Sequence, residues 1–103
     1  MARRPPKTDY RDPLLRKTLL ALAVNLEKTR TNVPKLSQQK LATLAGIASS
    51  TVSEIERGDV VDLRLSTLTA LAGILEVDPL RLLKINEELI RKFLTSKASR
   101  KQK

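Results

Sequence analysis

The chain has 103 residues, the size of one small domain, and 41% of them are hydrophobic, with 19 leucines and only Tyr10 and Phe93 as aromatic residues. The 20 Lys and Arg residues outnumber 11 Asp and Glu, and the net charge of +9 favours an anionic partner, nucleic acid before a membrane surface. Cysteine and histidine are absent, which excludes disulfides, thiolate zinc sites and the commonest general base. The sequence therefore predicts no metal site, no cofactor and no enzyme activity. No apolar run has the roughly 18 residues that a membrane span needs, so we expect no membrane association.

The positive charge lies toward the two ends of the chain. Residues 14–35 carry a net charge of +4 and residues 91–103 carry +6, whereas residues 36–83 carry −2. Any account of an anionic partner must explain this uneven distribution of charge.

The first predicted helix begins at Asp12-Pro13, where an acidic N-cap precedes a proline at the first helical position. Its leucines recur at helical spacing, and Val33-Pro34 ends the pattern, so we expect it to run to about Arg30. Residues 1–12 before it contain two prolines and few apolar side chains, and they are interpreted as a flexible basic arm.

Two short helices are predicted next. Ser37 is a favourable N-cap for the first of them, and Gly46 can end it in a left-handed turn. The second spans residues 49–57 and ends at Gly58. A small residue, Ala42, lies four positions before Gly46, and Val52 and Ile55 give the second helix an apolar inner face. This spacing is typical of a helix-turn-helix.

A fourth helix, capped by Asp62 or Ser66, follows the same leucine pattern through Leu75. Asp78-Pro79 starts a fifth helix, which is expected to extend to Leu94. We expect fraying from Lys97 onward. The predicted organisation is an arm (residues 1–12), a domain (residues 13–94) and a basic tail (residues 95–103). No strand pattern is present, which indicates an all-α fold.

The run from Leu36 to Gly58 resembles the helix-turn-helix of the phage repressor and Cro family, also called XRE-like regulators, and the likeness extends over about residues 19–83. The resemblance implies a compact five-helix, lambda-repressor-like domain that binds double-stranded DNA. Such domains usually bind as homodimers to a two-fold symmetric operator, with the third helix in the major groove.

Matched position by position, the resemblance assigns contacts to residues on and beside the third helix. Ser49 and Ser50 fall where the family reads its first bases. Glu54 and Ser53 fall at groove-facing positions one turn later. Phosphate contacts are implied for Gln38, which would also steady the third helix, and for Arg57, with Lys40 and Thr51 as neighbours. Arg3 and Arg4 in the arm are further candidates, with a purely solubilising tail as the alternative.

The third helix departs from the strongest base readers, because it has no Arg, Lys, Asn or Gln before Arg57. Serine hydroxyls discriminate weakly between bases, and Glu54 either accepts from cytosine or is passive. A solvated polar face is the alternative. Glu56 matches a family glutamate that pairs with an arginine of the first helix, here Arg30.

The last predicted helix has a wide apolar stripe that includes Leu89, Ile90, Phe93 and Leu94. Closure of the domain's own core explains part of this stripe. A homodimer interface is the functional interpretation, since two copies would read two half-sites.

The leading hypothesis is a sequence-specific, cytoplasmic and nucleoid-associated transcriptional regulator, a repressor rather than an activator, with room for a small protein partner. The sequence does not distinguish between a phage-type repressor, an antitoxin of a toxin–antitoxin pair and a controller protein of a restriction–modification system. The alternative is a protein-interaction module of the same fold, including antitoxin-type proteins, that binds DNA only non-specifically through its basic tails. Such binding would be steeply salt-dependent and indifferent to sequence.

Overall fold

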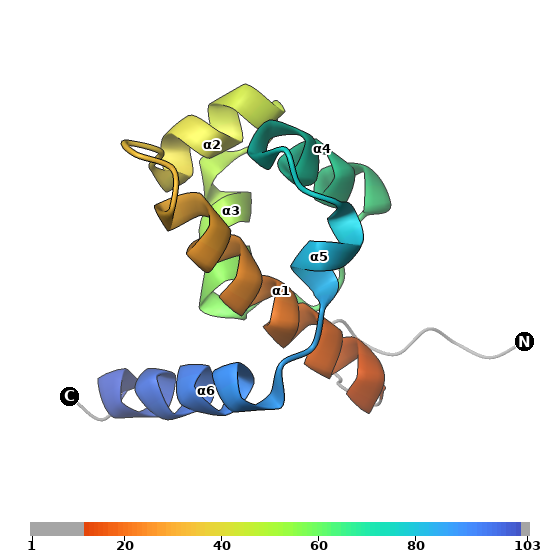
Figure 1. Cartoon of the computed structure of the whole chain (residues 1–103). Coiled ribbons are helices and arrows are strands. Elements are labelled where there is room, and N and C mark those ends of the chain that lie inside the picture. The colour runs from red at the N-terminus through yellow and green to blue at the C-terminus, as the bar shows by residue number, and fades with distance from the viewer. Residues whose placement is uncertain (1–11, 102–103) are drawn as a thin grey trace, which may run out of the picture.

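A computed structural model describes residues 12–101, and within that range it contains six helices and no strand (Figure 1). The helices are α1 (Pro13–Thr31), α2 (Gln38–Ala45), α3 (Ser49–Arg57), α4 (Leu65–Leu75), α5 (Pro79–Leu83) and α6 (Glu87–Lys101). The predicted all-α fold is confirmed, and α1 to α4 match the predicted positions closely.

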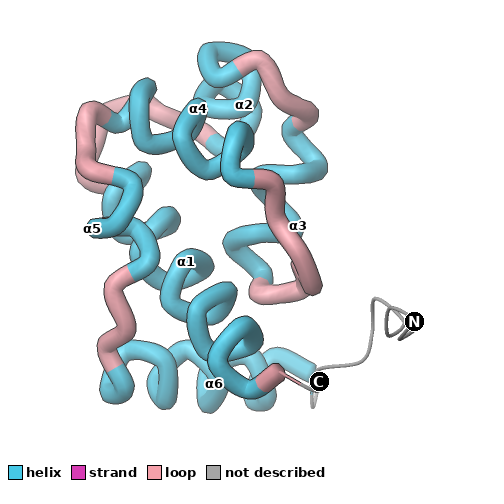
Figure 2. Tube along the Cα trace, turned by 90° about the vertical axis from the view of Figure 1, so that its right-hand side faces the viewer, coloured by secondary structure: helices cyan, strands magenta, loops and turns pink. Residues whose placement is uncertain are grey.

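The longest helix, α1, lies at the centre of the arrangement and contacts α3, α5 and α6. It begins as the sequence predicts: Asp12 Oδ1 accepts hydrogen bonds from the backbone N–H groups of Leu14 and Leu15, and Pro13 follows the cap. Figure 2 shows α2 and α4 above α1 and α6 below it. The chain is thus built around one helix whose faces serve different neighbours.

The core is aliphatic and falls into two clusters. The larger cluster contains residues from each of the first five helices. It includes the fully buried leucines Leu22, Leu26, Leu41, Leu71 and Leu82. The smaller cluster joins Leu20 and Ala21 of α1 to Ile90 of α6, with Ile85 and Phe93 packed against them. Each fully buried leucine stabilises the fold by about 1.5–3 kcal/mol relative to an exposed one.

The predicted cap of α4 is wrong. Arg64 occupies the N-cap position and makes no side-chain capping bond. The carboxylate of Asp62 accepts instead from the backbone N–H of Leu63, within the preceding loop.

The prediction of a single extended fifth helix is also wrong, because the helix is interrupted at residues 84–86. Lys84 is extended, with φ −63° and ψ 125°, and Asn86 Oδ1 accepts from the backbone N–H of Leu89 near the start of a new helix. Asn25 of α1 donates to the carbonyl oxygens of Leu82 and Lys84, at 2.9 Å each. These carbonyl oxygens therefore accept from α1 instead of from the backbone N–H groups of a continued helix. The break redirects α6 so that Ile90 packs on α1.

Helix α6 continues to Lys101, beyond the predicted fraying at Lys97. The Lys97 ammonium group donates to the carbonyl oxygen of Arg57 and to the Asp59 carboxylate, and these bonds anchor the C-terminal half of α6. No described helix is both long and apolar enough to cross a membrane.

Two glycines end helices in the same left-handed conformation but have different surroundings. Gly46 has φ +74° and open space where a Cβ would lie, whereas a Cβ at Gly58, with φ +75°, would lie 3.0 Å from the Phe93 ring. We expect Gly46→Ala to lower the free energy of unfolding by about 1–2 kcal/mol, the cost of the left-handed backbone alone. Gly58→Ala should cost more, because the ring must also move.

Chemical denaturation of both variants measures the difference. Combining Gly58→Ala with Phe93→Leu should reduce the excess cost of the alanine, since the two residues are in contact. Equal losses for the two single variants would contradict the packing of α6 against Gly58.

Candidate nucleic-acid interface

The two helices of the motif, α2 and α3, are joined by the three-residue turn 46–48. Gly46 adopts the left-handed conformation that the sequence predicts, and the backbone N–H of Ile47 donates to the carbonyl oxygen of Ala42 over 3.0 Å. The side chains of Leu41, Val52 and Ile55 are fully buried in the larger cluster. The turn and this shared core fix the orientation of α3.

The outer face of α3 is accessible. Ser49, Ser50, Glu54 and Arg57 are exposed, and Thr51 and Ser53 are half-buried. Ala48 at the N-cap makes no side-chain capping bond, so the first backbone N–H groups of α3 have no side-chain cap. A helix start of this kind is favourable for a phosphate group.

A buried carboxylate, that of Glu56, links α1, α2 and α3. Arg30 forms a two-pronged ion pair with it, at 2.8 Å from Nε and 3.1 Å from Nη2, and Arg30 Nη1 donates to the carbonyl oxygen of Leu36. The Glu56 side chain is only 3% exposed, and no buried polar side-chain atom among the described residues lacks a partner. The predicted Arg30–Glu56 pair is confirmed. The hydrogen bond from Arg30 to Glu56, with the attraction between their charges, raises the pKa of Arg30.

Gln38 reaches the same carboxylate. Its Nε2 donates to Glu56 Oε1 over 2.8 Å, which ties the start of α2 to the end of α3. Part of the role expected of Gln38, the steadying of α3, thus has a direct structural basis. The side-chain amide carries a second N–H, which is the group that a phosphate contact would use. Lys40, also expected at a phosphate, is exposed in the first turn of the same helix.

A second polar cluster surrounds the C-terminal end of α3. Arg57 donates to Ser53 Oγ over 2.6 Å and to the Asp59 carboxylate over 3.0 Å. Lys97 of α6 donates to Asp59 over 2.7 Å and to the Arg57 carbonyl oxygen over 2.6 Å. A cation at the last carbonyls of a helix is favourable for the helix dipole. Hydrogen bonds from Lys97 and then Arg57 lower the pKa of Asp59.

Sequence reasoning missed Asp59 and Lys97 as members of this cluster. They lie 38 residues apart, and no periodic pattern relates them. It also missed Arg64, which shares with Glu54 and Arg57 a hollow of about 730 Å³ beside the end of α3. Arg64 is exposed at the N-cap of α4, and the sequence signals it only as a basic residue that follows the third helix.

The residues expected at a dimer interface have different surroundings. Ile90 is buried against α1, and Phe93 packs on the same cluster. Leu89 is half-buried, and Leu94 is 39% exposed. Core closure therefore uses Ile90 and Phe93, and Leu94 remains the most accessible member of the stripe. Arg3 and Arg4 lie outside the described residues.

The comparison with protein families decides the class of this motif. A family model described as helix-turn-helix matches residues 34–82, from the loop before α2 to α5. The matched segment belongs to the phage repressor/Cro-like helix-turn-helix family. This family consists of DNA-binding regulatory domains that are typically not enzymes. No curated protein and no solved structure matched the chain. The described residues contain no group of three or more acidic side chains that could hold a metal ion.

The stability of the helix-turn-helix domain should depend strongly on Glu56. Replacing Glu56 with alanine leaves Arg30 partly buried without its partner, and we expect a loss of about 3 kcal/mol in the free energy of unfolding. Urea denaturation measures this loss. Glu54→Ala removes the same charge from the exposed face of α3 and should change stability by less than about 0.5 kcal/mol. Equal effects of the two substitutions would mean that the buried cluster contributes little.

The lowered pKa of Asp59 predicts a pH-dependent contribution to stability. A carboxyl group with a lowered folded-state pKa stabilises the fold above its ordinary value of 3.8, and this stabilisation is lost as the pH falls through the folded-state pKa. Wild type should therefore exceed Asp59→Asn in stability at neutral pH, by an amount that shrinks in acid. The contribution is small because the side chain is 47% exposed.

Denaturation of the two proteins at several pH values tests this expectation. The Lys97→Met substitution removes the larger cause of the lowered pKa of Asp59. In that background, Asp59→Asn should therefore lower the free energy of unfolding at neutral pH by less than it does in the wild type. A stability difference between wild type and Asp59→Asn that does not change with pH would contradict the lowered pKa of Asp59.

Proposed function

We propose that the protein is a sequence-specific regulator of transcription that binds double-stranded DNA with α3 in the major groove. The observation that supports this most directly is the accessible outer face of α3, held in place by the Glu56 cluster and by the Gly46 turn. The family match supports DNA binding in general. A repressor is the simpler role, since it requires only that the bound domain occupy its site. On this proposal the protein acts in the cytoplasm at the nucleoid, without enzyme activity.

In the proposed complex, base contacts come from Ser49 and Ser50 at the exposed start of α3. Ser53 and Glu54 follow one turn later. Ser53 Oγ accepts a hydrogen bond from Arg57, which leaves its own O–H available to donate to a base or a phosphate oxygen. Glu54 would accept from a cytosine amino group. These short side chains reach only bases that the helix approaches closely, so its depth in the groove determines the sequence preference.

Phosphate contacts would supply most of the affinity, because α3 offers few strong base readers. The residues assigned to this role are Gln38, Lys40, Thr51 and Arg57, to which we add Arg64. Arg3 and Arg4 of the N-terminal arm are proposed as additional contacts. Asp59 carries the opposite charge, and its bonds to Arg57 and Lys97 neutralise it locally.

A homodimer on a two-fold symmetric site is part of the proposal. Leu94 is exposed and Leu89 is half-buried, so both are accessible to a second copy. Ile90 and Phe93 would contribute by supporting that surface from the core side. Selection of bound sequences from random duplex DNA at near-physiological salt tests site preference and symmetry together. A two-fold symmetric motif is the expected result. Binding without a motif that disappears as salt rises would favour the protein-interaction module instead.

Two substitutions should separate base reading from phosphate binding. Ser50→Ala should change the preferred sequence more than the overall affinity, because it removes a groove-facing hydroxyl group. Lys40→Ala should weaken binding to all sequences alike and lower the salt dependence by about one released counterion. Fluorescence anisotropy at several salt concentrations, with selected and scrambled duplexes, measures both effects. Ser66→Ala on α4 is the matched control and should change neither quantity. An unchanged preference in Ser50→Ala would show that the assigned register of α3 is wrong.

A further inference from the structure

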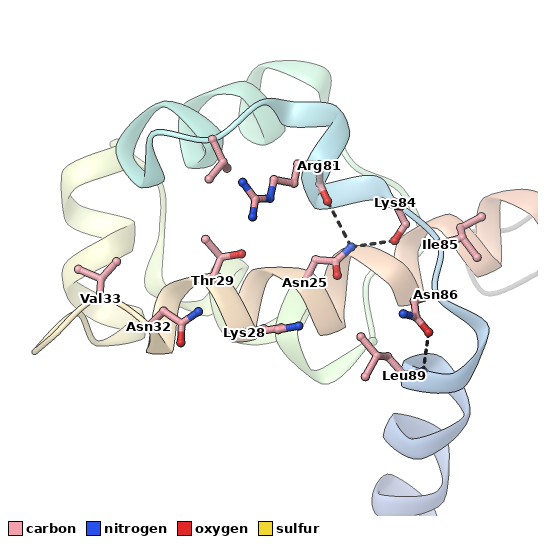
Figure 3. Close-up of a pocket in the computed structure, with 11 residues that line it drawn as sticks. Asn25, Lys28, Thr29, Asn32, Val33, Arg81, Lys84, Ile85, Asn86 and Leu89 are labelled. Atoms are coloured by element: carbon pink, nitrogen blue, oxygen red, sulfur yellow. Dashed lines mark hydrogen bonds between the residues drawn. The ribbon is translucent and has the colours of Figure 1, made fainter.

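A basic groove lies between the C-terminal half of α1, helix α5 and the connecting residues 84–86 (Figure 3). Its volume is about 430 Å³. The charged residues that line it are Lys28, Arg81 and Lys84, all of which are cationic and exposed. No carboxylate lines the groove. Its charge is therefore positive, in contrast to the mixed charges around the end of α3.

Helix α1 separates this groove from the helix-turn-helix face. Asn25, Lys28, Thr29 and Asn32 follow the spacing of three and four residues that places side chains on one face of a helix, and all four line the groove. Arg30 points to the other side, where it pairs with Glu56 of α3. The groove and the proposed DNA-contacting surface thus lie on opposite faces of α1.

The three cations have no acidic partner within the described chain. None of the ion pairs among the described residues includes Lys28, Arg81 or Lys84. The nearest acidic residue in sequence to Arg81, Asp78, accepts a hydrogen bond at the start of α5 instead. Three like charges beside one concave surface repel each other, and a bound anionic group would relieve that repulsion.

The groove also offers apolar surface and a fixed shape. Val33, Val77 and Ile85 line it, and Val33 is 40% exposed. Asn25 holds the 84–86 segment through its bonds to the carbonyl oxygens of Leu82 and Lys84, as the dashed lines of Figure 3 indicate for Lys84. A preformed site loses little conformational freedom on binding, which favours affinity.

We propose that this groove docks an acidic segment of a partner protein. Carboxylates of the segment would pair with Lys28, Arg81 and Lys84, and a leucine-type side chain between them would contact Val33, Val77 and Ile85. A concave site of a few hundred Å³ accepts side chains, whereas a DNA duplex needs an open surface that its backbone can follow. The proposal goes beyond DNA binding and does not depend on it.

The test uses the full chain and two synthetic probes. One probe is a fluorescein-labelled 12-residue peptide of alternating Glu and Leu, and the other carries Ser in place of each Leu. We expect the Glu–Leu peptide to bind more tightly than the Glu–Ser peptide. In ¹⁵N-labelled protein it should shift the side-chain amide signals of Asn32 and Asn86 and leave those of Gln38 and Gln39 unchanged. Absence of shifts at millimolar peptide would overturn the proposal.

Charge-matched variants determine whether the groove itself binds the peptide. Replacing Lys28, Arg81 and Lys84 together with Gln should weaken binding of the Glu–Leu peptide about tenfold or more, since three charge contacts are lost. Replacing Lys35, Arg91 and Lys92 with Gln removes the same charge elsewhere and should weaken binding less than about twofold. Thermal unfolding verifies that both variants fold. Equal weakening would mean that net charge alone attracts the peptide, and the proposal would fail.

Two further outcomes would assign the groove to another occupant. A DNA duplex that shifts the Asn32 and Asn86 amide signals would make the groove part of the nucleic-acid surface. A groove variant that loses self-association in sedimentation velocity would make the occupant a second copy of the chain. Either result overturns an acidic segment as the occupant. DNA selection with the groove variant reports separately on the proposed regulator, because none of the three cations is among the assigned DNA contacts.

Discussion

The buried carboxylate of Glu56 is the interaction on which the geometry of the helix-turn-helix depends. It accepts from Arg30 at the end of α1 and from Gln38 at the start of α2, while it belongs to α3 itself. A charge placed in a region of low polarity is costly unless it is paired and fully hydrogen-bonded, and this carboxylate is. Because Arg30 also binds the carbonyl oxygen of Leu36, the loop before α2 is held by the same group. The apolar core brings the helices together, and this cluster determines how they are aligned.

A second polar cluster connects the end of α3 to a helix beyond the family-matched segment. Lys97 of α6 contacts the last carbonyl of α3 and the Asp59 carboxylate, and Asp59 in turn holds Arg57. The position of the Arg57 guanidinium group is thus linked to the packing of α6. Since Phe93 of the same helix covers Gly58, α6 stabilises the end of α3 by both apolar and polar contacts. If the protein dimerises through α6, the dimer contact and the DNA contact are joined through this short path.

The electrostatic organisation of the molecule differs from what its net charge suggests. The helix-turn-helix face mixes acidic and basic side chains, with Glu54 and Asp59 beside Arg57 and Arg64. The groove on the other side of α1 has only basic ones. A net charge of +9 is therefore no guide to which face binds an anion. Local geometry, and above all the carboxylates that neutralise nearby cations, decides where the positive field is strong.

The sequence by itself determined the local elements. Caps such as Asp12 and Ser37, and the helix-ending Gly46 and Gly58, act through bonds within a few residues, so their pattern predicts helix positions well. The accessible face of α3 followed from the placement of its apolar residues on the opposite side. The Arg30–Glu56 pair was also predictable, but only through resemblance to a family, because the two residues lie 26 positions apart.

Only the tertiary structure decided where the last helix begins and what it contacts. The apolar pattern of residues 79–94 continues through the interruption between α5 and α6. The spacing of leucines carries no information about whether a side chain elsewhere in the chain binds the backbone carbonyl groups that a continuous helix would use. Asn25, some 60 residues earlier, provides that partner and turns the chain at Lys84. The contacts of Lys97 and the basic groove then follow from this turn. Interactions between distant residues depend on the position of the backbone in space, and that position is a property of the packed chain rather than of any local pattern.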